Sequence, residues 1–246
     1  MSSSDVLSAT TTNNMSFIVR LCGALAPTAS VVVGLSPAST IQQISIERNV
    51  GSFPLLPYST MIINATLWFA YGILKQNVSV WSGNGICLVV GIAYFLIYIK
   101  FSPPASPILP GTVQQHIQAV VGMVVATILI STLPILNDPA ELIGSVGCII
   151  VVLLFGSPLV VLRQVIQTKD ARSIPLPFTV ACTINCFLWT VFGFWGVRDF
   201  YIYFPNALGL MLSVAQLILK VYYSDNGKNG FSKAIQMSEG RPLAVV

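Results

Sequence analysis

Apolar residues gather along the chain in seven long runs, and shorter polar segments separate them. The runs cover residues 17–37, 55–74, 80–100, 113–133, 141–162, 177–197 and 200–222. Each run has about the 20 residues that an α-helix needs to cross the hydrocarbon core of a bilayer. The pattern therefore predicts an all-α integral membrane protein with seven transmembrane helices.

Polar and aromatic residues recur at a constant spacing, which indicates an internal duplication. The matched pairs include Pro37 with Pro158, Pro54 with Pro175, Asn64 with Asn185, Trp68 with Trp189 and Gly72 with Gly193, all 121 residues apart (189 − 68 = 121). Asn84 and Asn206 are 122 apart, which requires one inserted residue. Duplication inside an apolar chain is how many transporters are built.

The two copies divide the seven runs into three, one and three. We predict a tail (1–16), a first three-helix repeat (17–100), a linker with the fourth helix (101–133), a second three-helix repeat (134–222) and a C-terminal tail (223–246). The linker is rich in proline over residues 101–107, and the polar C-terminal tail is predicted to be disordered. Four spans separate the starts of the copies, so both enter the membrane in the same direction and the repeats are parallel.

Charge agrees with a membrane protein and predicts its orientation. Only 8% of the 246 residues are charged, whereas soluble domains carry about 25%. The net charge of +4 needs no nucleic acid to explain it. Nine of the twelve basic residues lie after the first, third and fifth spans or in the C-terminal tail, and three lie on the other side. By the positive-inside rule the N-terminus is outside and the C-terminus cytosolic, in the plasma membrane or, with the lumen as the outside, in an internal membrane.

Groups for catalysis, cofactor or metal binding are nearly absent from the sequence. His116 is the one histidine, near the start of the fourth run, where we interpret it as an interfacial polar residue. The five cysteines form no Cys-x-x-Cys pair, and the acidic residues lie in tails, loops or span ends. Carriers coupled to ions bury a carboxylate or histidine near mid-membrane. We therefore predict neither an enzyme nor an ion-coupled carrier, and no cofactor.

Uncharged polar residues inside the runs predict a binding pocket between the copies. Asn64 and Trp68 are four residues apart and share one helix face, and Asn185 repeats this arrangement with Trp189. Asn84 and Asn206 lie in the third and seventh runs. An amide that faces lipid is costly, so each must face protein or a water-filled cavity. Amides that only join helices explain a single Asn, whereas four Asn and two Trp in matched places favour a pocket for a neutral, hydroxyl-rich solute such as a sugar.

Prolines near the cytosolic ends of the spans have two interpretations. They are Pro37, Pro54 or Pro57, Pro158, and Pro175 or Pro177. Proline removes a backbone hydrogen bond, so these residues either end helices or form a ring of hinges.

Together these motifs resemble those of the SWEET family of sugar transporters over residues 17–223. The resemblance rests on Ser-Pro at 36–37, a proline-rich entry to the second run, Asn-x-x-x-Trp followed by Tyr-Gly at 64–72, and Pro-Asn-x-Leu-Gly at 205–209. It implies alternating access by two parallel three-helix repeats, which move mono- or disaccharides down their gradient. It further implies sugar binding by Asn84 and Asn206 between Trp68 and Trp189, and an extracellular gate at Tyr71, Phe192 and Asp199. Family members can form trimers, so a homo-oligomer is compatible with the resemblance.

Other function classes account for less of the pattern. A PQ-loop-type exporter of amino acids or other small solutes has the same architecture, but the chain contains no Pro-Gln pair. A membrane receptor or scaffold would leave the matched polar residues unexplained, and an intramembrane enzyme would lack a catalytic group.

Overall fold

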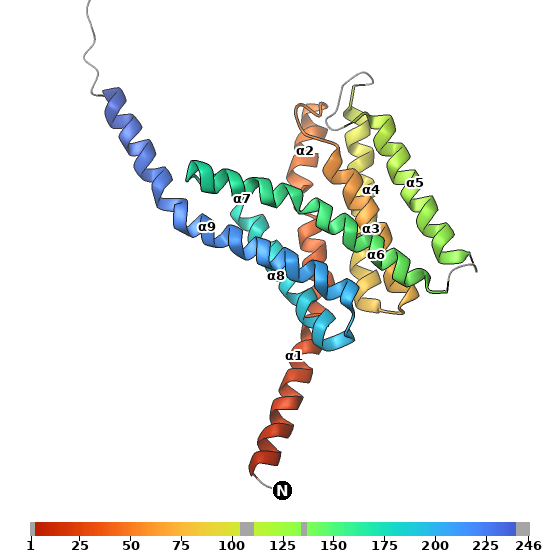
Figure 1. Ribbon diagram of the computed structural model, residues 1–246. Helices are drawn as coiled ribbons and strands as arrows, with labels where there is room; N and C mark the ends of the chain where they lie inside the picture. Colours follow the sequence, from red (N-terminus) through yellow and green to blue (C-terminus); the bar gives the residue numbers. More distant parts are fainter. Residues whose placement is uncertain (1–2, 104–110, 134–136, 240–246) are drawn as a thin grey trace, which may run out of the picture.

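The computed structural model of the protein describes residues 3–103, 111–133 and 137–239, with side chains described between residues 16 and 223. These ranges are helical and contain no strand (Figure 1). The elements are α1 (Ser3–Gly34), α2 (Ala38–Glu47), α3 (Leu56–Leu74), α4 (Val78–Phe101), α5 (Val113–Thr132), α6 (Pro139–Leu154), α7 (Gly156–Thr168), α8 (Leu176–Val191), the π-helical segment η1 (Phe192–Val197) and α9 (Phe200–Glu239).

Long apolar helices account for the predicted membrane spans. Six helical stretches in the described ranges are long and apolar enough to cross a bilayer. The remaining predicted span, 55–74, is α3, whose bounds Leu56–Leu74 match it closely. Large apolar side chains on the helix surfaces remain exposed, among them Val89, Leu153 and Val221. A bilayer covers such surfaces, so the prediction of an all-α membrane protein is confirmed.

Several helices run further than the sequence predicted. The first span continues past Pro37 into α2 as far as Glu47, because the amide of Ile41 donates to the Pro37 carbonyl and restarts the helix at once. At the termini, α1 begins at Ser3 and α9 ends at Glu239, so the prediction of a disordered tail after Tyr223 is wrong as far as Glu239. A formed helix grows by one hydrogen bond per residue without a new nucleus, which permits such polar extensions. Most of the proline-rich linker, 104–110, lies outside the described residues.

Short sequence signals fix where the central helices begin. The side chain of Asn77 accepts from the Val80 amide at the start of α4, and Thr112 forms a capping box with Gln115 at the start of α5. At α6 the Asp138 carboxylate accepts from the Glu141 amide and is followed by Pro139 in the first turn.

Helix packing has the same order in both predicted repeats. In the first, α4 packs against α1 and α3; in the second, α9 packs against α6–α7 and α8. Across the repeats α1 meets α8, and α3 meets α6, which are matched pairs. In Figure 1 the chain enters α1 and α6 from below and leaves α4 and α9 towards the top. This arrangement is compatible with two parallel repeats.

Backbone conformation repeats as well. Among the described residues, the non-glycine residues with positive φ are Arg48 (53°), Gln76 (52°), Lys169 (55°) and Arg198 (53°). They form two matched pairs, because 169 − 48 = 121 and 198 − 76 = 122. A left-handed residue costs about 1–2 kcal/mol outside glycine. Two such turns at the spacing of the sequence repeat show that the copies keep the same loop geometry.

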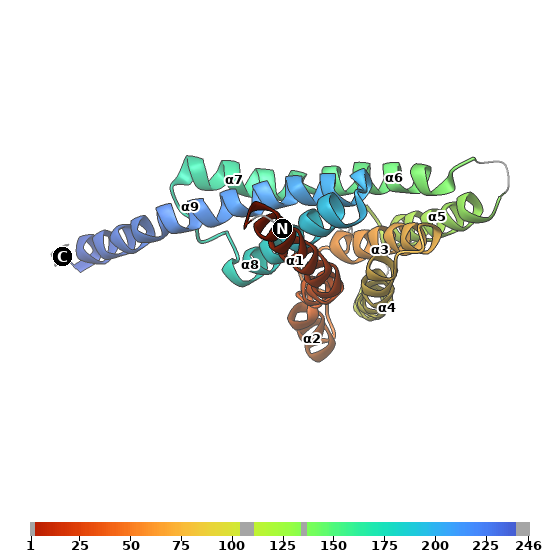
Figure 2. The same ribbon diagram turned by 90° about the horizontal axis from the view of Figure 1, so that it is seen from below.

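The predicted fourth span, α5, packs beside the first repeat rather than between the copies. It contacts α3 and, more lightly, α6, and both views place it at the edge of the molecule (Figures 1 and 2). His116 of α5 is buried, and its Nδ1 lies 2.8 Å from the hydroxyl of Ser59 in α3. It therefore joins two helices, and its place at the membrane interface stays a prediction.

Candidate functional site

A cavity of about 210 Å³ lies between the two repeats. The residues that line it are Ser30, Asn64, Trp68, Val80, Asn84, Val151, Phe155, Asn185, Cys186, Trp189, Ile202, Pro205 and Asn206. All six residues predicted for the binding pocket are among them. They reach the same cavity because α3 and α8, and likewise α4 and α9, occupy matched places in the two repeats.

Asn84 and Asn206 are held in the same way. In α4 the Asn84 Nδ2 donates to the Val80 carbonyl over 2.8 Å, and in α9 the Asn206 Nδ2 donates to the Ile202 carbonyl over 2.7 Å. Each bond joins residues four apart in one helix and fixes the amide plane. No described residue donates to either Oδ1, so both oxygens and the second amide hydrogens are available to a solute.

Asn64 and Asn185 have their oxygens occupied instead. The Trp68 indole Nε1 donates to Asn64 Oδ1 over 3.1 Å, and the Ser30 hydroxyl donates to Asn185 Oδ1 over 2.9 Å. Both amides therefore offer their NH₂ groups as donors. With acceptors on Asn84 and Asn206, the cavity has donors and acceptors in matched pairs.

Indole rings and apolar side chains form the rest of the wall. Trp68 and Trp189 are 9% and 6% exposed, so each shows only a small part of its ring to the cavity. None of the lining residues is acidic or basic. Such a site favours a neutral solute with hydroxyl groups and an apolar face.

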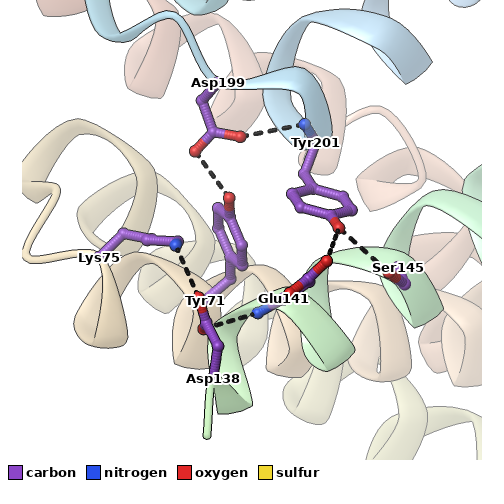
Figure 3. Close-up of polar contacts among 7 residues, drawn as sticks. All are labelled: Tyr71, Lys75, Asp138, Glu141, Ser145, Asp199 and Tyr201. Atoms are coloured by element: carbon purple, nitrogen blue, oxygen red, sulfur yellow. Dashed lines mark hydrogen bonds and ion pairs between the residues drawn. The ribbon is translucent and has the colours of Figure 1, made fainter.

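Tyr71 and Asp199 connect the two repeats where the C-terminal end of α3 meets the start of α9, both of which lie low in Figure 1. The Tyr71 hydroxyl of α3 donates to Asp199 Oδ2 over 2.6 Å, and Asp199 Oδ1 accepts from the Tyr201 amide over 3.0 Å (Figure 3). One oxygen of Asp199 therefore caps the start of α9, while the other accepts a hydrogen bond from Tyr71 in the opposite repeat. Trp68, Tyr71, Ile143 and Ile202 belong to one buried apolar cluster between these helices.

A second set of contacts surrounds this link. Lys75 Nζ lies 3.6 Å from Asp138 Oδ2, and Asp138 also accepts from the Glu141 amide. That backbone bond, aided by Lys75, lowers the pKa of the Asp138 carboxyl. The Tyr201 hydroxyl is 3.5 Å from Glu141 Oε1 and 3.4 Å from the Ser145 hydroxyl. These contacts join α3, α6 and α9 in Figure 3.

Phe192, the third predicted gate residue, points elsewhere. Its ring lies against Gly23 of α1, where a Cβ would come within 2.5 Å of it, and packs edge-on against Trp189. It matches Tyr71 in the repeat (192 − 71 = 121) but carries no hydroxyl. The structure therefore links Tyr71 with Asp199 and leaves Phe192 in the packing between α1 and α8.

The predicted hinge prolines lie at or near helix boundaries. Pro37 precedes α2, Pro57 and Pro177 stand in the first turns of α3 and α8, and Pro175 precedes α8. Pro54 lies in the loop before α3, and Pro158 follows the break between α6 and α7 at Phe155. All six stand where a helix breaks or starts, and their role as hinges stays a prediction.

Matched hydrogen bonds hold the loop that precedes α3 and the loop that precedes α8. Tyr98 of α4 donates to the Phe53 carbonyl over 2.5 Å, and Lys220 of α9 donates to the Ala171 carbonyl over 2.7 Å. Tyr98 and Lys220 occupy matched positions (220 − 98 = 122). Each repeat thus ties the loop before its second helix to its third helix, although with a different side chain.

Sequence reasoning missed Ser30, Cys186 and the apolar lining residues. In the sequence repeat Ser30 corresponds to Val151 (151 − 30 = 121), and Cys186 corresponds to Ala65. A search for polar residues matched in both copies cannot find either one. Only the placement of α1 and α8 beside the cavity reveals them.

Comparison with known proteins follows the same two segments. The family model described as "Sugar efflux transporter for intercellular exchange" matches residues 20–106 and again 141–228. The two matches start 121 residues apart (141 − 20) and end 122 apart (228 − 106), as the repeat does.

Similar individual proteins are named as sugar transporters. The chain is 26% identical to "Bidirectional sugar transporter SWEET12" of Oryza sativa subsp. japonica, over 86% of this chain and 70% of that protein. It is 28% identical to "Bidirectional sugar transporter NEC1" of Petunia hybrida (87% and 79%) and 29% identical to "Bidirectional sugar transporter SWEET9" of Arabidopsis thaliana (90% and 85%). A solved eukaryotic SWEET transporter superposes with a TM-score of 0.75 at 25% identity, over 86% of this chain and 99% of that chain.

Proposed function

The chain belongs to the SWEET family of sugar efflux transporters, and from that premise we propose that it carries mono- or disaccharides down their gradient by alternating access. One observation carries the proposal to this chain: a neutral cavity between the repeats, lined by four Asn amides and two Trp rings. The family is one of transporters, so the protein is not an enzyme.

Sugar chemistry fits the cavity group by group. A hydroxyl group donates and accepts, and the cavity presents acceptors on Asn84 and Asn206 and donors on Asn64 and Asn185. The C–H face of a pyranose ring stacks on an indole such as that of Trp68 or Trp189. A cationic amino acid would require an acidic partner, and none of the lining residues supplies one.

Each predicted site residue has a role in this proposal. Asn84 and Asn206 bind sugar hydroxyls from opposite repeats, Trp68 and Trp189 flank the sugar, and Asn64 and Asn185 complete the polar wall. Tyr71 and Asp199 form the outer gate, while Phe192 supports it through packing. The hinges at the cytosolic end are Pro37, Pro54 or Pro57, Pro158, and Pro175 or Pro177.

Uptake of radiolabelled glucose, fructose and sucrose into liposomes that contain the purified protein tests the proposal. We expect saturable, gradient-driven uptake of at least one of them. Asn84→Ala or Asn206→Ala should each weaken binding by roughly 10- to 100-fold, because a lost hydrogen bond that leaves a desolvated partner costs about 1–3 kcal/mol. Asn137→Ala, in the exposed loop before α6, serves as the control. Normal uptake per molecule in both cavity mutants would remove these amides from the site.

Orientation and membrane are part of the same proposal. Arg48, Lys100 and Lys169 stand at the C-terminal ends of α2, α4 and α7. These ends point towards the upper part of Figure 1, and we assign that side to the cytosol of a plasma-membrane protein. A tag before residue 1 should be accessible on intact cells, and a tag after Val246 only after permeabilisation. Protection of the N-terminal tag would reverse the assignment. Family membership extends the proposal to a homo-oligomer, which light scattering of the detergent-solubilised protein would measure.

A further inference from the structure

The two halves of the cavity differ in how their tryptophan is held. In the first repeat Trp68 Nε1 donates directly to Asn64 Oδ1 over 3.1 Å. In the second repeat Trp189 Nε1 donates to the Ser30 hydroxyl over 2.8 Å, and that hydroxyl donates to Asn185 Oδ1 over 2.9 Å. A serine thus stands between the indole and the amide in one half only.

The source of this serine explains why the other half lacks it. Ser30 belongs to α1 of the first repeat, whereas Trp189 and Asn185 belong to α8 of the second. The matched residue in the second repeat, Val151 of α6, also lines the cavity but carries no hydroxyl. Trp68 therefore donates to an acceptor on its own helix, Asn64 Oδ1.

We infer that Ser30 is a positioning residue that makes the cavity asymmetric and so selects how a sugar lies in it; this inference rests on the proposed function. The Trp189–Ser30–Asn185 relay occupies the Asn185 oxygen and directs its NH₂ group to the cavity. Because Ser30 lies in α1 of the first repeat, the relay also restrains the Trp189 ring through a hydrogen bond to the opposite repeat. Across the cavity, Val151 and Phe155 present an apolar wall.

Two chemically different walls favour one orientation of the solute. Beside α1 the cavity offers the Ser30 hydroxyl, whose second lone pair remains open to a donor, and the Asn185 amide. Beside α6 it offers the matched Asn64 amide of α3, but Val151 and Phe155 present only carbon atoms where the other side has the Ser30 hydroxyl. A sugar should therefore bind with its hydroxyl-rich edge towards Ser30 and a less polar edge towards Val151.

Single-hydroxyl deletions in the sugar test this orientation. For a sugar that the wild type carries, the affinities of its monodeoxy analogues are measured with wild type and with Ser30→Ala, Ser30→Thr and Val151→Thr. We expect Ser30→Ala to weaken binding of the parent sugar by roughly 3- to 30-fold, from loss of net hydrogen bonding, and Ser30→Thr to retain most of the affinity. The analogue that lacks the hydroxyl facing Ser30 should lose affinity in the wild type and lose no more in Ser30→Ala, because coupled groups are not additive.

A readout without sugar tests the relay itself. Removal of the hydrogen bond to the indole N–H should shift tryptophan emission between wild type and Ser30→Ala, and the shift should disappear when both proteins also carry Trp189→Phe. Absence of the shift, or a deoxy-sugar profile that is the same in wild type and Ser30→Ala, would overturn the inference. Absence of uptake of all sugars by the wild type would instead overturn the proposed function, and with it the sugar-facing part of this inference. The control Val151→Thr, which places a hydroxyl in the apolar wall, should alter the profile at a different sugar position.

Discussion

The phenol of Tyr71 donates a 2.6 Å hydrogen bond to the carboxylate of Asp199, 128 residues further along the chain. This bond joins α3 of the first repeat to the start of α9 in the second. Tyr71 also belongs to the buried apolar cluster whose members Trp68 and Trp189 line the cavity. A contact between the repeats therefore joins them at the end that we propose to face outwards, and opening of that end must break it.

Tyr71→Phe should shift the protein towards an outward-open state. The bond to a carboxylate contributes about 1.5–3 kcal/mol, so its loss should raise the ratio of open to closed protein roughly 10- to 100-fold. Cys186 lines the cavity and reports on access. Its reaction with a membrane-impermeant thiol reagent, applied from outside, should be faster in the mutant.

Two controls accompany this measurement. Tyr203→Phe removes a hydroxyl that has no hydrogen-bond partner among the described residues, and it should leave the labelling rate unchanged. Cys186→Ala should remove the difference in labelling rate between wild type and Tyr71→Phe, because the four other cysteines do not line the cavity. Equal rates in wild type and Tyr71→Phe would show that the bond does not control access.

Gly72→Ala and Gly193→Ala should each destabilise the fold. A Cβ at Gly72 would lie 2.6 Å from the Trp81 amide nitrogen, and one at Gly193 would lie 2.8 Å from the matched Tyr203 nitrogen. Backbone cannot move aside as a flexible side chain does, so we expect a loss of about 1–3 kcal/mol from overpacking. Thermal unfolding in detergent measures it, with Gly122→Ala as control because nothing lies within 4 Å of that position. An unchanged Tm in both mutants would contradict the close packing of these helices.

Lys220→Met should loosen the loop before α8. The mutation removes the 2.7 Å bond from Lys220 to the Ala171 carbonyl while it keeps an unbranched apolar stem. Hydrogen exchange of the amides at 169–174 should become roughly 10- to 100-fold faster, since a charged hydrogen bond contributes about 1.5–3 kcal/mol. Exchange in the matched loop, which Tyr98 holds, should not change, and Tyr98→Phe should give the reverse pattern. Exchange that stays the same in both loops would argue against these bonds.

Sugar uptake should be independent of a proton gradient. The cavity contains no acidic or basic residue, so no group at the site can exchange a proton when sugar binds. Initial uptake into liposomes should therefore be the same with and without an imposed pH difference or a protonophore. Accumulation of sugar above the external concentration would contradict a uniporter.

The Lys75–Asp138 pair should survive mild acidification. Bonds from the Glu141 amide and Lys75 lower the pKa of Asp138. A carboxyl whose pKa is lowered in the folded state stabilises the fold above its unfolded pKa of about 3.9, and this contribution is lost as pH falls through the folded value. The Tm difference between wild type and Asp138→Asn should thus be constant from pH 7 to 5 and shrink below about pH 4. The difference should be small, because both side chains are substantially exposed. A difference that disappears already at pH 5 would contradict the lowered pKa.

The local pattern of the sequence was sufficient to predict much of the fold and six of the residues that line the cavity. Hydrophobic run length depends only on bilayer thickness, so α3, α4 and α5 match their predicted spans within two residues. The 121-residue spacing assigns matched positions to matched helices. It therefore indicates that Asn64, Asn185 and their partners face one place, and all six predicted residues line one cavity.

Contacts between helices far apart in the sequence were decided by the tertiary structure alone. Ser30 has Val151 as its counterpart, so no repeat pattern marks it, and its role depends on α1 lying beside α8. Tyr71 and Phe192 are matched in sequence, yet one binds Asp199 and the other packs on Gly23. A helix period states which side chains share a face, but which neighbour that face meets depends on how all the helices pack together.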